Sequence, residues 1–401
     1  MEKLREVVLV SACRTAIGKF QGQFKDLTAR DLAIIAGKEA IKRAGIDMNV
    51  LDSCVMGEVL AGMQGSLPAK QVSYRIGLSE ESNACVVNQN CASGMRALEI
   101  AAHDIMVGQS DASLVIGVES MTNSPYMLAK ARGGFRMGDG QIFDSMTHDA
   151  LIDELSNGHM GITAENVAER YGITREECDT LAVASHNRAC AAIEAGKFKD
   201  EIVPVVLQTR KGEVVIDTDE HPIRGCTMET VGKLKPAFKK DGVITAANAS
   251  GINDAAAAVI LMSAEKAAEL GLKPMAKLVN VCGVGVDPKV MGLGPARAIP
   301  KCLKQAGLSF DDIDYYEINE AFSAQYIGCE RMLKEECGVE LSRDKVNHNG
   351  SGIGLGHPIG CTALRIIVSL LYEMKHEGYK RGVAALCVGG GPAMASIWEM
   401  L

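Results

Sequence analysis

The chain has 401 residues, of which 47% are hydrophobic, and its formal net charge is −8 at pH 7. This composition excludes a disordered chain, and the negative charge disfavours a general nucleic-acid surface, which needs clustered Lys and Arg. Thirteen cysteines without a C-x-x-C pair predict reduced thiols in the cytoplasm, not a disulfide framework or a zinc site. Forty-two glycines and only 4% aromatic residues favour an α/β protein with backbone close to a ligand.

The first elements alternate between strand and helix patterns. The apolar run VVLV is too short for a signal-peptide core, so we expect a first strand over 7–11. A helical pattern follows over 28–44 and a second strand pattern over 53–59. No segment approaches the run of about 18 to 20 apolar residues that spans a bilayer. The alternation predicts βαβ units and largely parallel sheets.

A weak internal repeat relates two parts of the chain. In the first half VNQNCASG (87–94) precedes a helical pattern and the apolar strand SLVIGVES (113–120). In the second half VNHNGSG (346–352) precedes GLGHPIG, another helical pattern and the strand VAALCVGGG (383–391). Such a repeat predicts two halves of similar architecture.

The segment 121–250 between these parts has a different character. It contains Gly-rich and Met-rich loops, one expected amphipathic helix around 164–197, and a basic stretch up to residue 240. Long irregular segments in compact proteins are usually functional, so we interpret 121–250 as an insertion that carries ligand contacts. A merely solvated insertion is the alternative.

Two motifs present reactive side chains at the start of helices. Cys91 follows an apolar strand and precedes a helix of small residues, where the helix dipole and free N–H groups would stabilise a thiolate. A buried, inert cysteine is the alternative. His357 in GLGHPIG is held by glycines and by Pro358 at a loop tip, which suits a positioned imidazole. Capping of the following helix is the alternative for this histidine.

Two further motifs follow apparent strands. Asn319 in EINEAFSA comes after DYYEI and precedes a helix, where an asparagine is commonly an N-cap. Cys387 ends a strand and leads into CVGGG, in which Gly389 can offer a backbone N–H to an oxyanion. A plain strand cysteine followed by a turn is the alternative for Cys387.

Taken together, NQNCASG, NEAFS, GHPIG and CVGGG resemble the signature motifs of thiolases, in this order. The resemblance covers almost the whole chain, from VVLVSACRTAIGKF through HMGITAENVAERYGI and NASGIND to the C-terminal glycines. It implies duplicated βαβαβαββ halves, with five-stranded mixed sheets in a layered α/β/α/β/α arrangement, plus an inserted loop domain. The expected N-terminal half is 1–120 with 251–272, the CoA-binding insertion is 121–250, and the C-terminal half is 273–401.

The resemblance also implies a ping-pong acyl transfer. Cys91 would take an acyl group from one coenzyme A thioester, with His357 as its base. Cys387 would remove an α-proton from acetyl-CoA, while His357 and a water held by Asn319 stabilise the enolate oxygen. The backbone N–H groups of Cys91 and Gly389 would stabilise the tetrahedral oxyanion.

The motif GHMG resembles that of biosynthetic, short-chain thiolases, so the expected reaction is the reversible condensation of two acetyl-CoA into acetoacetyl-CoA and CoA. Coenzyme A is then substrate and product, with no tightly bound cofactor, metal, nucleic acid or membrane partner, and the protein is a homo-oligomer, either a dimer or a tetramer. Arg224 is the candidate for the CoA phosphates, although loop arginines are often merely solvated. The other substrate-binding residues that the resemblance implies are Leu151, His159, Met160, Phe238, Ala246, Ser250, Met291, Ala321 and Phe322.

Several alternatives stay open on the sequence alone. Ala92 and GSGIGLGHP depart from the short-chain pattern, which leaves a broader-chain degradative 3-ketoacyl-CoA thiolase of fatty-acid β-oxidation as the runner-up. Decarboxylating condensing enzymes share Cys91 but do not need Cys387, and a silent lipid-binding relative would not need all four reactive positions. A dehydrogenase is disfavoured because GSGIGLG and GVGVDP lack the G-x-G-x-x-G spacing.

Overall fold

The computed structural model describes residues 4–156, 158–210 and 212–401. The helices of the first half are α1 Ala29–Ala44, α2 Pro68–Ile76 and α3 Ser93–Met106. Its strands are β1 Val7–Arg14, β2 Gly18–Lys19, β3 Ser53–Gly57, β4 Asn83–Val87, β5 Ala112–Ser120 and β12 Asn253–Ser263. The strands and the helix expected at the start of the chain are therefore confirmed.

The second half follows a short helix, α7 Ala264–Glu269. Its strands are β13 Ala276–Gly285, β14 Tyr315–Ile318, β15 Arg381–Cys387 and β16 Pro392–Met400. Its helices are α8 Gly294–Ala306, α9 Ser323–Cys337, α10 Gly352–Leu355 and α11 Ile359–Glu377. Short 3₁₀ turns occur at Met48–Val50, Ala131–Gly133, Pro288–Leu293, Phe310–Asp312 and Arg343–Lys345.

The strand order shows the duplication directly. The first half runs β1-β12-β5-β3-β4, and the second half runs β13-β16-β15-β14 in the corresponding order. The parallel pairs lie at the two ends of the strand order, β5-β3-β4 in the first half and β15-β14 in the second, and the pairs between them are antiparallel. The largely parallel sheets predicted from the strand and helix alternation are therefore wrong. The internal repeat predicted from the sequence is therefore confirmed.

The two expected five-stranded sheets meet at one edge. Strands β1 and β13 pair through Val8 with Lys277 and Leu9 with Ala276, which joins the halves into one continuous mixed sheet. The fifth strand of the second half is reduced to a parallel bridge between Tyr316 and Val346, at the place that β4 takes in the first half.

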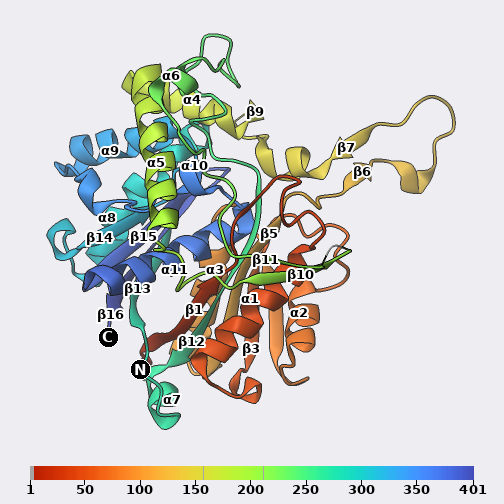
Figure 1. Cartoon of the computed structure of the whole chain (residues 1–401), viewed down its shortest axis with the longest axis vertical. Coiled ribbons are helices and arrows are strands. Elements are labelled where there is room, and N and C mark those ends of the chain that lie inside the picture. Colours follow the sequence, from red (N-terminus) through yellow and green to blue (C-terminus); the bar gives the residue numbers. More distant parts are fainter. Residues whose placement is uncertain (1–3, 157, 211) are drawn as a thin grey trace.

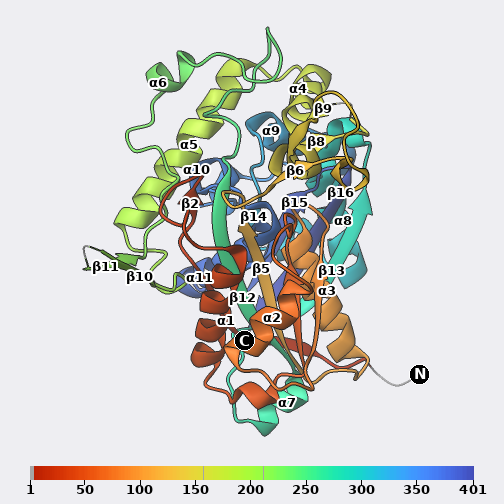
Figure 2. The same cartoon turned by 90° about the vertical axis from the view of Figure 1, so that its right-hand side faces the viewer.

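Five layers result from this arrangement. Helix α11 contacts β5 and β12 of the first half as well as β14 and β15 of the second, and it packs on α3. Helices α1 and α2 cover the outer face of the first half, and α8 covers the outer face of the second, with α9 packed against α8. Figure 1 shows α11 between the strands of the two halves, and Figure 2 gives the view along the layers, turned by 90°. The predicted layered fold is confirmed.

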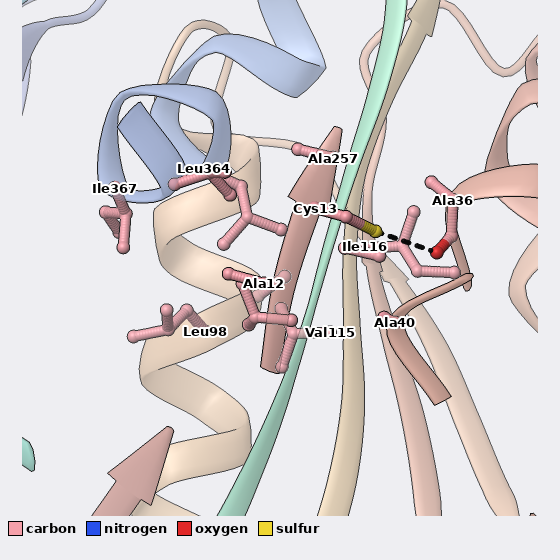
Figure 3. Packing of buried hydrophobic residues seen from close by; sticks show 14 of the residues in the cluster. Ala12, Cys13, Ala36, Ala40, Leu98, Val115, Ile116, Ala257, Leu364 and Ile367 are labelled. Carbon is pink, nitrogen blue, oxygen red and sulfur yellow. Dashed lines mark hydrogen bonds between the residues drawn. The ribbon is translucent and has the colours of Figure 1, made fainter. Parts of the chain in front are cut away.

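Strand β1 shows why the central strands are apolar on both faces. Cys13 points toward α1, where its Sγ donates a hydrogen bond to the carbonyl oxygen of Ala36 at 3.2 Å (Figure 3). The preceding residue, Ala12, faces the opposite side, toward Leu98 of α3 and Leu364 of α11. Side chains alternate along a strand, so helices on both faces favour apolar residues on both sides of the strand.

The insertion between β5 and β12 contains a projecting arm and two long helices. Strands β6 Tyr126–Leu128 and β7 Ile142–Asp144 form the arm, which extends away from the body in Figure 1. The π-helix Thr147–Leu151 and the two-residue strands β8 Ile152–Asp153 and β9 Gly158–His159 follow. The remaining elements are α4 Met160–Tyr171, α5 Arg175–Glu194, β10 Val205–Thr209, β11 Gly212–Ile216 and α6 Met228–Gly232.

The single helix predicted around 164–197 is wrong, because α4 and α5 are separate. Gly172 ends α4 with a left-handed φ of 61°, and its N–H bonds to the carbonyl of Ala168. Thr174 then begins α5 with a capping box, in which Glu177 and Thr174 each bond to the other's backbone N–H. The sequence contains both signals in YGITREE, and they outweigh the continuous helical pattern.

The described residues contain no helix that is both long and apolar enough to cross a bilayer. All thirteen cysteines have free thiols. In this same part of the chain, no group of three or more His, Cys, Asp or Glu side chains could hold a metal ion.

Candidate active site

A cavity of about 670 Å³ lies where the two halves meet the insertion. The predicted catalytic residues Cys91, His357 and Gly389 line it. So do nine of the predicted substrate-binding residues, namely Leu151, His159, Met160, Phe238, Ala246, Ser250, Met291, Ala321 and Phe322. The fold thus gathers around one cavity predicted residues that are up to 298 positions apart (91 to 389) in the sequence.

Cys91 lies in the turn between β4 and α3, directly after Asn90 with a left-handed φ of 45°. Its Sγ is 3.3 Å from Nε2 of His357. Burial raises the pKa of the Cys91 thiol to about 11, although the backbone N–H groups of Gly389 and of Cys91 itself bond to the sulfur and oppose the rise. The thiolate expected from the helix terminus is therefore wrong for the resting protein, because desolvation outweighs the N–H donors.

His357 lies between α10 and α11 and is buried. Its Nδ1 is 2.6 Å from the Oγ1 of Thr362, and its backbone N–H donates to the Oδ1 of Asn253 at 2.9 Å. Burial lowers the pKa of His357 to about 3, and the charge of Arg365 acts in the same direction. The imidazole is thus neutral at rest, and Pro358, not His357, is the N-cap of α11.

Gly356 shows how closely this loop approaches strand β12. Its φ is 101°, and a Cβ there would lie 2.6 Å from the side-chain amide of Asn253. Only glycine adopts this conformation without strain and leaves room for the amide.

Cys387 ends β15 and is fully buried. Burial raises the pKa of its thiol well above the usual range, and the neighbouring Cys91 adds to the rise. Two residues later, the carbonyl of Gly389 accepts a hydrogen bond from Nδ2 of Asn90 at 3.1 Å. A Cβ on Gly389 would lie 2.2 Å from the Cε of Met160. There is therefore no room for a side chain at this position of the cavity wall.

Asn319 follows β14 and is fully buried, but it does not line the cavity. Its backbone N–H donates to the carbonyl of Ala385 at 3.0 Å. Neither atom of its side-chain amide has a hydrogen-bond partner in the described part of the chain. Helix α9 begins at Ser323 with Phe322 before it, so the N-cap interpretation of Asn319 is wrong.

One wall of the cavity is aromatic. The rings of His159 and Phe238 stack with centroids 4.6 Å apart, and Phe238 meets Phe322 edge-on at 6.1 Å. The Nδ1 of His159 accepts the N–H of Gly161 at 3.1 Å, which caps α4 and fixes the ring. This wall and Met160 limit the space beside Cys91 and Gly389.

Arg224 does not line the cavity. Its side chain is 69% exposed, and its guanidinium lies 3.6 Å from the carboxylate of Glu194 on α5. Among the described residues that do line the cavity, Lys19 carries the one ammonium or guanidinium group. Sequence reasoning missed Lys19, because only the pairing of β2 with β12, Lys19 opposite Asn253, brings it there.

Other lining residues were also missed, and no local sequence signal separates them from ordinary apolar or polar positions. They are Phe20, Asn90, Met121, Ala150, His221, Ile223, Ala237, Ala249, Gly251, Ile252 and Ile359.

A pair of buried carboxyl groups supports the site from behind. Glu119 accepts the backbone N–H groups of Val59, Leu60 and Gly360 at 3.1, 3.0 and 2.8 Å. These bonds tie β5 to the start of α11. Burial and the neighbouring Glu119 raise the pKa of Glu58 to about 8. Burial also raises the pKa of Glu119, to about 7, although its three N–H donors oppose the rise, so Glu58 holds its proton more tightly than Glu119 does.

Comparison with known families matches the model of the thiolase N-terminal domain to residues 7–265 and that of the thiolase C-terminal domain to residues 272–400. The chain belongs to the thiolase family. It is 51% identical over 399 residues to an acetyl-CoA acetyltransferase from Syntrophomonas wolfei, with 99% of this thiolase and 100% of that protein covered.

Solved structures agree with this assignment. An acetyl-CoA acetyltransferase structure from Syntrophomonas wolfei has a TM-score of 0.99 at 58% identity, and human mitochondrial 3-ketoacyl-CoA thiolase has 0.95 at 38%. Both comparisons cover 100% of each chain. The thiolase prediction is confirmed, and the dehydrogenase alternative is wrong.

Proposed function

We propose that this thiolase is an acetyl-CoA acetyltransferase, which condenses two acetyl-CoA into acetoacetyl-CoA and CoA and also catalyses the reverse thiolysis. The observation that carries the proposal is the 3.3 Å contact between Sγ of Cys91 and Nε2 of His357 in a cavity that Gly389 also lines. The names of full-length relatives at 51% and 47% identity support the choice of acyl group.

In the first half-reaction, Cys91 attacks the thioester carbonyl while its proton passes to Nε2 of His357. The backbone N–H groups of Cys91 and Gly389, which bond to the sulfur at rest, are close enough to stabilise the oxyanion of the tetrahedral intermediate. The intermediate collapses, and departing CoA takes the proton back from His357. An acetyl-Cys91 thioester and a neutral imidazole remain.

In the second half-reaction, Cys387 gives its proton to the neutral His357 and then removes the α-proton of a second acetyl-CoA. The raised pKa of Cys387 makes its thiolate a strong base, which suits a weakly acidic carbon. The enolate attacks acetyl-Cys91, acetoacetyl-CoA leaves, and Cys91 recovers a proton from His357. At the end of the cycle Cys91 and Cys387 are again thiols and His357 is again neutral.

The enolate oxygen needs a donor besides the imidazolium of His357. The unpartnered, fully buried amide of Asn319 supports the prediction that this residue holds a water molecule for that purpose. At the other end of the substrate, Lys19 replaces Arg224 as our candidate for the CoA phosphates, since its charge lies at the cavity and that of Arg224 does not.

We further propose a cytoplasmic homo-oligomer, either a dimer or a tetramer. Thirteen free thiols support a reducing compartment. Exposed apolar side chains on the β6–β7 arm, among them Tyr126 (71%) and Ile142 (68%), support burial of the arm against another copy. The net charge of −8 gives no support to a nucleic-acid partner.

The two half-reactions can be tested separately. We expect Cys91→Ala to lose both the incorporation of label from radioactive acetyl-CoA and all turnover. Cys387→Ala should still be labelled on the Cys91 peptide and should exchange labelled CoA with acetyl-CoA, but its condensation rate should fall at least about 100-fold. Condensation by Cys91→Ala, or absence of label on the Cys91 peptide of the wild type, would refute the proposal.

A degradative 3-ketoacyl-CoA thiolase is the second candidate, because the human mitochondrial enzyme of that name has nearly the same fold. The aromatic wall formed by His159 and Phe238 beside Met160 favours the short-chain function. Comparing kcat/KM for acetoacetyl-CoA with that for 3-ketohexanoyl-CoA and longer substrates decides between the two.

A further inference from the structure

We propose that Thr362 is a positioning residue for the reaction: its hydroxyl holds the imidazole of His357 in the tautomer with the proton on Nδ1, so that Nε2 is free to accept the proton of Cys91. This inference rests on the proposed function for its role in turnover, but the tautomer itself can be tested without substrate. None of the four signature motifs contains Thr362, which lies five residues after His357, in the first turn of α11.

Three contacts form a chain from the sulfur to the backbone. Sγ of Cys91 lies 3.3 Å from Nε2 of His357, and Nδ1 of the same ring lies 2.6 Å from Oγ1 of Thr362. Oγ1 of Thr362 donates to the carbonyl of Pro358 at 2.9 Å. A carbonyl oxygen can only accept, so this last bond fixes the direction of the chain.

The proton balance follows from that direction. The single hydroxyl proton of Thr362 goes to Pro358, so Oγ1 accepts from Nδ1–H of His357. A neutral imidazole has one N–H, so Nε2 carries a lone pair and accepts from the thiol of Cys91. Every hydrogen in the chain then has an acceptor.

The reversed chain leaves one hydrogen unmatched. If Thr362 donated to Nδ1, Nε2–H would point at the sulfur of Cys91, which already receives the N–H groups of Gly389 and of Cys91 itself. The thiol proton would then lack an acceptor, because His357 is its one side-chain partner within the described ranges. That arrangement would also block transfer of the proton to His357.

Cys91 and His357 are both neutral at rest, so the tautomer of His357 decides whether Nε2 can accept the thiol proton. Burial lowers the pKa of His357 to about 3 and raises that of Cys91 to about 11. Arg365, one turn beyond Thr362 on α11, is fully buried, and its side-chain nitrogens make no hydrogen bond to any described residue. Its positive charge further disfavours an imidazolium, so a single proton has to be placed on one of the two nitrogens.

The direct test is the ¹⁵N spectrum of the whole enzyme labelled at its eight histidines, recorded in the solid state between pH 6 and 9. The His357 signal is assigned as the one missing in His357→Asn. We expect an N–H-type shift for Nδ1 and an unprotonated, imine-type shift for Nε2. A proton on Nε2, or a doubly protonated ring, would overturn the proposal.

Substitution tests the consequence for catalysis. Thr362→Val keeps the shape but removes the hydroxyl, and Thr362→Ser keeps the hydroxyl. We expect Thr362→Val to reduce kcat about 100-fold or more, with KM changed less than about threefold, and Thr362→Ser to stay within about threefold of the wild type. The ¹⁵N spectrum of Thr362→Val should show protonated Nε2.

Ser369→Ala is the matched control, because it removes another buried hydroxyl of α11, which contacts Glu201 at 3.3 Å and not His357. It should leave kcat unchanged. Equal losses in Thr362→Val and Thr362→Ser, or an active Thr362→Val, would refute the positioning role. If the wild-type tautomer is as expected but the enzyme does not act on acetoacetyl-CoA, the proposed function fails and the tautomer assignment stands.

Discussion

The side-chain oxygen of Asn253 accepts the backbone N–H of His357 at 2.9 Å, so strand β12 of the first half holds the histidine loop of the second. The Nδ2 of the same side chain donates to the carbonyl of Gly18, also at 2.9 Å. Asn253 is fully buried. One amide therefore fixes His357 relative to the half of the molecule that carries Cys91.

Removing that amide should damage both stability and catalysis. Asn253→Ala leaves the N–H of His357 without its side-chain acceptor and removes one donor from the carbonyl of Gly18. A buried polar group left without a partner costs about 1–3 kcal/mol. We expect a lower free energy of unfolding in denaturant titrations and a fall in kcat of about 10-fold or more. Asn166→Ala is the control, because that side chain bonds at an exposed site to the carbonyl of Lys289. Unchanged kcat in Asn253→Ala would contradict this role.

Gly389→Ala should weaken stabilisation of the oxyanion. The new Cβ would lie 2.2 Å from Cε of Met160 and 3.2 Å from Nδ2 of Asn90, so the backbone N–H has to move away from Cys91. Loss of one such donor typically costs about 10²- to 10³-fold in kcat. Gly285→Ala is the control, since its Cβ would meet no atom within 4 Å. The prediction fails if steady-state assays give both variants the same kcat.

Met160→Ala should widen the space beside the catalytic residues. Its thioether contacts the position of Gly389 and lines the cavity together with the His159 and Phe238 wall. One added methylene in an apolar pocket contributes about 1–3 kcal/mol, so the kcat/KM ratio of 3-ketohexanoyl-CoA to acetoacetyl-CoA should rise about 10-fold or more. A constant ratio would show that another residue limits chain length.

Glu58 should make stability depend on pH. Its pKa rises from the ordinary 4.5 to about 8 in the folded protein, by burial and by Glu119, so the folded state holds this proton more tightly than the unfolded state. The corresponding stability is fully present below pH 4.5 and is lost as pH rises through 8. Each pKa unit of this shift corresponds to about 1.4 kcal/mol, so the fall in unfolding free energy with rising pH is measurable.

Glu58→Gln should reduce the dependence of the unfolding free energy on pH, because the amide stays neutral at every pH. The measurement is the unfolding free energy from denaturant titrations between pH 5 and 8.5. Glu265→Gln, at an exposed position, should keep the wild-type slope. A slope that is equally steep in Glu58→Gln would assign the pH dependence to other groups.

Much of the fold could be predicted because its signals are local. Helix α1 is bounded in the sequence by its capping threonine, Thr28, and its terminal glycine, Gly45. The repeat is recognised from the similar motifs around Cys91 and residue 350. The break between α4 and α5 was also encoded locally, by Gly172 and Thr174, but a continuous apolar pattern hid it. Cap chemistry is stronger than periodicity at such a point.

The sequence by itself determined the family and the duplicated halves and predicted the reactive residues, since these depend on short motifs and their order. The tertiary structure decided which charges reach the cavity: Lys19 does through strand pairing, and Arg224 turns toward Glu194. It also decided that Cys91 and His357 are neutral and that Thr362 orients the imidazole. Burial and hydrogen-bond direction depend on atoms from distant segments, and no stretch of sequence contains that information.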